Sequence, residues 1–132
     1  MKTQSLKNRV ANGFKLNQMN NETYALRRKV IEIIYTAKKK GFNLPRIEVR
    51  IVNTEINNGA CGYAYLNKNI VHINEKWVNI NNECLTHIVL HEIVHAVTGF
   101  EHDNNCYLMQ PCLPSRNPNM ELTWNRFGHY IK

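Results

Sequence analysis

His91-Glu92-Ile93-Val94-His95, followed by Gly99 and His102, is the most specific pattern in this chain. Two histidines four residues apart on a helix project from the same face, so both imidazoles can bind one metal ion. A catalytic zinc ion takes three protein ligands and keeps its fourth position open. His102 can supply the third ligand if Gly99 ends the helix with a positive φ and turns the chain back. The pattern therefore predicts that His91, His95 and His102 bind Zn2+.

Glu92 lies directly after the first histidine of this pattern. From that position its carboxylate can accept a proton from a zinc-activated water and so act as a general base. A purely structural zinc site has no use for such a group. Random placement of the same residues would produce HExxH in roughly 2% of shuffled chains. We therefore prefer a hydrolytic site to the alternative, a buried helix whose histidines bind no metal.

The helix that carries this pattern is predicted to run from about Asn82 to Thr98. A helix that is apolar nearly all round is buried, and burial gives metal ligands a rigid setting. His87 lies one turn before the pattern and is expected to be an ordinary helix residue, with a contact to a zinc ligand as the alternative. His72 and His129 have no partner at ligand spacing. The apolar residues of the helix are Leu85, Ile88, Val89, Leu90, Ile93, Val94, Ala96 and Val97.

The remaining sequence predicts a small α+β domain over residues 20–132, preceded by a flexible basic arm, 1–19. A first helix should begin at Asn20 or Asn21, bury one apolar stripe and end at Gly41. Alternating patterns predict strands at 46–53, 61–66 and 70–73, within a mixed sheet of three to four strands. Residues 57–59 are expected to be a loop, and 67–69 a tight hairpin or short loop. The predicted stripe of the first helix is Val30, Ile31, Ile34 and Ala37.

Charge and composition narrow the possible partners. The first 50 of the 132 residues hold 12 of the 17 Lys and Arg, and the net charge is +7. This basic half is expected to be a solvated surface, with contact to an anionic partner as the alternative. No apolar run is long enough for a membrane span or a secretory segment, so a cytoplasmic monomer without a membrane partner is expected. The four cysteines lack disulfide or zinc spacing and are expected to be reduced, although Cys106 and Cys112 could pair in an oxidising environment.

Several segments between Gly62 and Lys132 resemble the catalytic core of zincin metallopeptidases, above all the metzincin clan of matrixins, adamalysins and archaemetzincins. The zinc pattern itself carries most of the resemblance. Residues 62–66 and 70–77 are similar to the edge strand and the following strand that precede the active-site helix. Residues 106–111 are similar to the Met-turn, and 120–127 to the C-terminal helix that supports the site.

The resemblance implies a zincin-like fold and a zinc metalloendopeptidase acting on protein or peptide substrates. It implies that Met109 lies beneath the zinc and that Gly99 supports the third histidine. Asp103 matches the residue that follows this histidine in the adamalysin branch. An extended substrate would add a strand to the edge formed by Gly62, Tyr63, Ala64, Tyr65 and Leu66.

The chain departs from the metzincin pattern by one residue, because it reads HExxHxxxGxxH, and no tyrosine follows Met109. Its element order also resembles SprT-like zinc metalloprotease domains, our second choice. Those domains continue into a helix soon after the third histidine, which the prolines at 111, 114 and 118 disfavour here. A further alternative is a non-catalytic zinc-stabilised binding or structural protein, whose basic N-terminal helix contacts nucleic acid or a protein.

Overall fold

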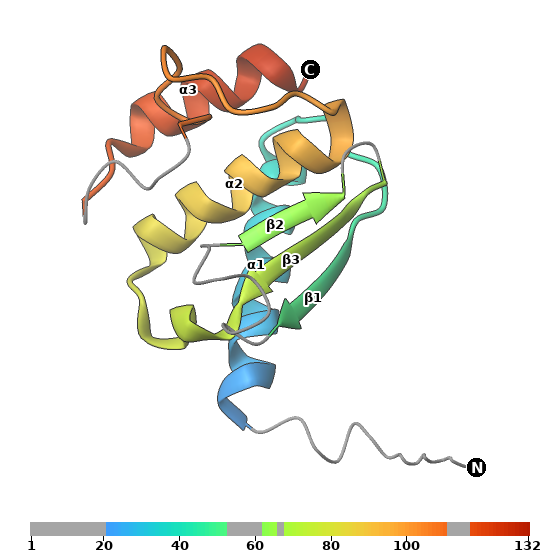
Figure 1. Ribbon diagram of the computed structural model, residues 1–132, viewed down its shortest axis with the longest axis vertical. Coiled ribbons are helices and arrows are strands. Elements are labelled where there is room, and N and C mark those ends of the chain that lie inside the picture. Colours follow the sequence, from blue (N-terminus) through green and yellow to red (C-terminus); the bar gives the residue numbers. More distant parts are fainter. Residues whose placement is uncertain (1–20, 53–61, 66–67, 111–116) are drawn as a thin grey trace.

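The computed structural model describes residues 21–52, 62–65, 68–110 and 117–132. The predictions for the arm 1–19, the loop 57–59, Leu66 and Cys112 fall outside these residues. The described elements, in chain order, are α1 (Asn21–Lys39), β1 (Glu48–Val52), β2 (Gly62–Tyr65), β3 (Ile70–Asn74), the 3-10 helix η5 (Glu75–Asn79), α2 (Asn82–Thr98) and α3 (Met120–Tyr130). Figure 1 shows α2 lying against the strands and α3 packed across α2 near the C-terminus.

The three strands form one mixed sheet in the order β1-β3-β2. β1 is parallel to β3, with Val49 opposite Val71, whereas β2 is antiparallel to β3, with Ala64 opposite Val71. This confirms the predicted α+β class and the mixed sheet, with β2 at one edge of the described strands. The strand predicted over 46–53 begins two residues later than expected, because pairing with β3 starts at Glu48, and its predicted last residue, 53, lies outside the described residues.

α1 begins and ends where the sequence predicts. Lys38 and Lys39 occupy its last turn, and Gly41 follows with φ 101°. The buried stripe is Leu26, Val30, Ile34 and Ala37. The prediction that Ile31 is buried is wrong, since 40% of it is exposed. Its position is about 100° around the helix from Val30, which turns it away from a stripe spaced by four, four and three residues.

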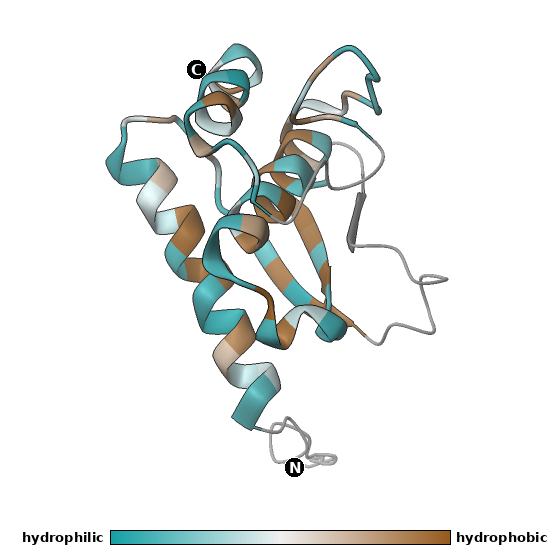
Figure 2. Ribbon diagram, turned by 90° about the vertical axis from the view of Figure 1, so that its left-hand side faces the viewer, coloured by the Kyte–Doolittle hydropathy of each residue, from teal (hydrophilic) through white to brown (hydrophobic). Residues whose placement is uncertain are grey.

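α2 is the central element of the molecule and has the bounds that the sequence predicts. The Asn81 side chain caps its first turn by accepting a hydrogen bond from the Cys84 N–H at 2.8 Å. Every residue from His87 to Ala96 is buried, and the helix contacts α1, α3, β2 and β3. Figure 2 shows the apolar positions of the strands and long helices turned toward the middle of the molecule. An N-cap, an apolar run and a terminal glycine thus define one buried helix.

Two shorter helices flank α2 in the chain. η5 precedes it and was not predicted; the Asn74 side chain caps this 3-10 helix by accepting from the Lys76 N–H at 3.1 Å. α3 extends three residues beyond the predicted end at 127. Its Phe127 meets the Phe42 ring edge-on, with ring centroids 5.0 Å apart. Within the described residues, no helix is long and apolar enough to cross a membrane.

The left-handed backbone conformation of Gly99 can be tested by substitution, with a second glycine as the control. Gly99 adopts φ 80°, which an L side chain tolerates poorly, so Gly99→Ala should lower the free energy of unfolding by about 1–2 kcal/mol. Gly128→Ala, inside α3, should not destabilise, because the added Cβ meets the Phe42 ring at an ordinary 3.5 Å and alanine favours a helix. Urea unfolding measures both. An unchanged stability in Gly99→Ala would contradict the left-handed turn.

Candidate metal centre

Three histidines form a compact cluster at the C-terminal end of α2. His91 and His95 come from the helix, and His102 comes from the segment that follows Gly99. One nitrogen from each ring can be chosen so that all three lie within 4.8 Å of one another. The ring centroids of His102 lie 5.2 Å from His91 and 4.9 Å from His95. The structure therefore brings together the three residues that the sequence singles out as metal ligands.

Backbone carbonyls fix the orientation of both helical imidazoles. Nδ1 of His91 lies 2.7 Å from the carbonyl oxygen of Leu108, and Nδ1 of His95 lies 2.6 Å from that of Phe100. A carbonyl can only accept a hydrogen bond, so in each ring Nδ1 carries the proton and donates it. Each neutral imidazole consequently keeps an unprotonated Nε2 with a lone pair. Such a carbonyl partner is the usual support of a metal-binding histidine.

The two Nε2 atoms of His91 and His95 face each other at 3.1 Å. With both protons on Nδ1, neither Nε2 has a hydrogen to donate, so two lone pairs meet at close range. A cation between them removes this repulsion. Two nitrogens that bind one zinc ion tetrahedrally at about 2.0–2.1 Å would lie about 3.3 Å apart. The observed separation therefore fits a shared metal ion.

Burial keeps the helical histidines in the neutral form that a metal requires. It lowers the pKa of His91 to about 4, although the hydrogen bond to Leu108 acts in the opposite direction. Burial also lowers the pKa of His95, against the hydrogen bond to Phe100. Near neutral pH both rings are therefore unprotonated, and a divalent ion does not have to compete with protons for them.

The turn at Gly99 positions both the Phe100 carbonyl and His102. The Gly99 N–H donates to the carbonyl of His95 at 3.0 Å, and the φ of 80° then reverses the chain. This reversal brings the Phe100 carbonyl to His95 and carries the exposed His102 toward the helical pair. The residue inserted relative to the metzincin pattern is taken up by α2, which continues to Thr98. The distance from the glycine to the third histidine is unchanged, so the turn still reaches the cluster.

The loop 103–109 closes back on itself beside the cluster. The Asp103 N–H donates to the Met109 carbonyl at 2.8 Å, and the Asp103 side chain accepts from the Asn105 N–H at 2.9 Å. Asp103 therefore holds the loop closed, while Met109 is completely buried. The carbonyl of Leu108, immediately before Met109, is the one that orients His91. This adjacency is compatible with the predicted Met-turn. Leu108 and Phe100 act through backbone atoms, so no side-chain pattern in the sequence could have identified them.

Glu92 is the buried acid of the site, with only 3% of its surface exposed. Burial raises its pKa to about 8. Within the described residues, its Oε1 has no hydrogen-bond partner. Glu92 lies three residues before His95, a spacing that places two side chains side by side on a helix. A buried carboxyl that has an oxygen without a hydrogen-bond partner, and that lies beside candidate metal ligands, is a candidate catalytic group.

The other histidines lie outside the cluster. His87 is buried, and its Nδ1 lies 2.8 Å from the Thr123 hydroxyl of α3. Its ring also meets the Tyr107 ring edge-on at 5.4 Å between centroids. His87 therefore connects α2 to α3 and to the loop, in agreement with the prediction of a helix residue one turn before the site. His72 is buried on β3, and His129 is exposed on α3.

The predicted substrate strand corresponds to β2, Gly62–Tyr65, which pairs with β3 and contacts α2. Cys84 and Cys106, the two cysteines within the described residues, are buried thiols, as the reduced state requires.

Comparisons of the chain with protein-family models, with curated proteins and with solved structures found no match. The zincin, metzincin and SprT-like resemblances therefore remain predictions from the sequence.

Removal of the third histidine tests the cluster as a metal centre. We expect one divalent ion per chain in the wild-type protein. His102→Ala should weaken its affinity by about 10-fold to 100-fold or more, because a nitrogen ligand is lost. His129→Ala removes an exposed histidine outside the cluster and should leave the affinity unchanged. Titration of metal-free protein against a chromophoric chelator measures all three, and equal affinities would exclude His102 from the site.

The buried His87 predicts a pH dependence of stability. Its pKa is about 4 in the folded protein because of burial, against about 6.5 when unfolded. Between these values the unfolded chain binds more protons, so stability falls as the pH falls from about 6.5 to 4. In metal-free protein, His87→Gln should reduce this loss by roughly 2 kcal/mol. Urea unfolding across this pH range measures it, and parallel curves for the two proteins would contradict the prediction.

Proposed function

We propose that this protein is a zinc-dependent metallopeptidase. One observation carries the proposal. The helix that supplies two of the three clustered histidines also carries Glu92, a buried carboxyl whose Oε1 has no hydrogen-bond partner within the described residues. A structural zinc site is closed by four protein ligands, whereas a catalytic site keeps three and leaves one position open. The donor set of three imidazoles and the addition of a carboxyl suited to proton transfer both favour the catalytic kind.

Zinc suits this donor set. Imidazole nitrogens bind zinc well, and the site offers three of them in an arrangement compatible with four-coordination. His91, His95 and His102 would hold the ion. When bound, zinc supplies Lewis acidity, which polarises a scissile carbonyl and makes water a stronger acid near neutral pH.

The chain's own contribution to the reaction is proton transfer by Glu92. Its carboxylate would accept the proton of the attacking water and deliver it to the leaving amine. A carboxyl with a pKa of about 8 would be largely protonated at pH 7. A divalent cation on the adjacent histidines would favour the carboxylate and lower this pKa, so loading the site also prepares the base. Burial of Glu92 excludes bulk water from this step.

The loop after His102 supports a metzincin-like lineage over a SprT-like one. In the described residues between Thr98 and Met120, namely 99–110 and 117–119, the chain forms turns and no helix. Met109 lies buried at the end of this loop, next to the carbonyl that orients His91. An extended substrate would pair with the edge strand β2 by main-chain hydrogen bonds, as the metzincin resemblance implies.

Glu92→Gln separates an enzyme from a zinc-stabilised binding protein. The amide keeps the size of the side chain but cannot accept a proton, so turnover should fall by about 100-fold to 10,000-fold. Zinc content should remain one ion per chain, because Glu92 is not a ligand. Glu83→Gln, at an exposed position in the first turn of the same helix, should retain full activity.

The measurement uses zinc-loaded protein and a mixed peptide library, with new peptide termini detected by mass spectrometry. Cleavage by the wild-type protein and Glu83→Gln, and its loss in zinc-loaded Glu92→Gln, would support the proposal. Equal cleavage by Glu92→Gln would contradict the role of this carboxyl. No cleavage by any variant, despite full zinc loading, would favour the non-catalytic binding or structural protein.

A further inference from the structure

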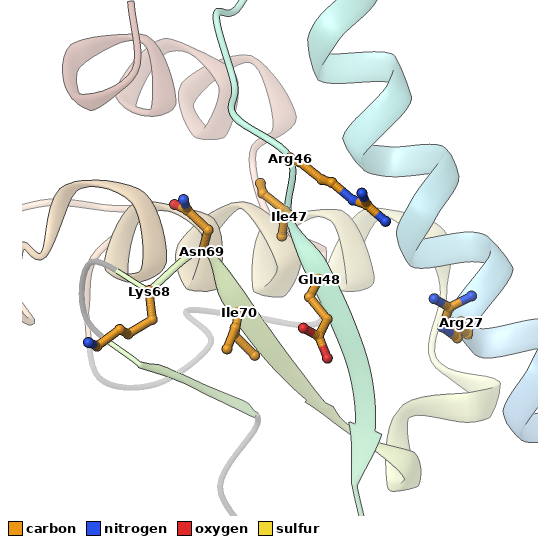
Figure 3. A pocket seen from close by; sticks show the side chains of 7 residues that line it. All are labelled: Arg27, Arg46, Ile47, Glu48, Lys68, Asn69 and Ile70. Carbon is orange, nitrogen blue, oxygen red and sulfur yellow. The ribbon is translucent and has the colours of Figure 1, made fainter.

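A second site lies at the start of β1 and β3, apart from the histidine cluster. It is a cavity of about 470 Å³, large enough for a small organic ligand. Three cations from separate parts of the chain line it: Arg27 from α1, Arg46 before β1 and Lys68 before β3. Figure 3 shows Arg27 and Arg46 on the α1 side of the pocket and Lys68 on the opposite side. The fold thus gathers positive charge that is far apart in sequence.

Within the described residues, the three cations outnumber the carboxylates of the pocket lining. None of the three forms a salt bridge or a hydrogen bond there. The one carboxylate in the lining is Glu48, and its Oε2 lies 2.6 Å from Nε of Arg50. The Arg50 hydrogen bond also holds the pKa of Glu48 below its usual value. Glu48 is therefore ionised; it pairs with Arg50 and also interacts electrostatically with Arg46, so the lining holds three cations against one carboxylate and stays net positive.

The rest of the lining is suited to a ligand with both a charged and an uncharged part. Ile47 and Ile70 provide apolar surface, and Asn69 provides an amide. Asn69 is anchored through its N–H, which donates to the Ala96 carbonyl of α2 at 3.2 Å. Asn69 also has φ 58°, a conformation that asparagine tolerates better than most residues. The turn that carries Lys68 is consequently attached to the core.

We propose that this pocket binds a phosphate group. Two guanidinium groups on the α1 side of the pocket can each present paired N–H donors to phosphate oxygens, and Lys68 adds positive charge at the opposite end. The flanking isoleucines and the asparagine would contact the organic part that bears the phosphate. This site is independent of the proposed peptidase activity. The phosphate can belong to a small molecule, such as a nucleotide, or to a nucleic-acid backbone.

The test uses fluorescent AMP and a fluorescent 12-nucleotide oligo(dT), measured by anisotropy with the full-length protein. Arg27→Gln/Arg46→Gln removes two pocket cations, and Lys38→Gln/Lys39→Gln removes the same charge from exposed positions at the end of α1. The pocket variant should lose roughly tenfold or more in affinity, and the control about twofold or less.

The outcomes decide the proposal and the source of the phosphate. Binding of AMP that depends on the pocket cations assigns the site to a small phosphorylated ligand. Binding of oligo(dT) alone, with the same dependence, assigns it to a nucleic-acid backbone. Equal losses in the pocket and control variants would show attraction to overall charge and overturn the site. Failure of both probes to bind the wild-type protein would overturn it as well.

Discussion

The candidate metal centre depends on the close approach of two atoms, Nε2 of His91 and Nε2 of His95, which lie 3.1 Å apart with their lone pairs facing each other. Each imidazole is committed to this arrangement, because its Nδ1 proton is donated to a backbone carbonyl. Rotation of either ring would lose a hydrogen bond inside a buried region, which is costly. A metal ion would replace the unfavourable contact by two coordinate bonds. Backbone atoms thereby orient the candidate ligands in advance.

The surrounding fold is organised to supply those carbonyls and to keep the rings neutral. The left-handed turn at Gly99 places the Phe100 carbonyl, and the loop closed by Asp103 places that of Leu108. His87 ties the previous turn of α2 to Thr123 on α3, so the helix is fixed on both sides of the cluster. The same burial that keeps the histidines neutral also raises the pKa of Glu92. A bound cation would lower this pKa and so favour the carboxylate form of the proposed base.

Local signals predicted the elements that position the site, but not its supporting contacts. α2 was predictable because a cap, an apolar run and a glycine all occur within 19 residues of the sequence. His102 was predictable because the spacing from Gly99 is short. Ile31 was misplaced because the apolar stripe of α1 passes beside it. The two carbonyls leave no mark in the sequence, and the basic pocket joins residues 27, 46 and 68, whose proximity only the tertiary fold determines.

In the proposed metal centre, three imidazoles and no thiolate hold one metal ion. X-ray absorption at the zinc K-edge, on protein loaded with one equivalent of zinc, tests it most directly. We expect a first shell of light atoms at about 2.0–2.1 Å, with the outer-shell scattering of three imidazoles. A sulfur shell at about 2.3 Å would place zinc on cysteines instead. That result, or the scattering of fewer than three imidazoles, would contradict the site described here.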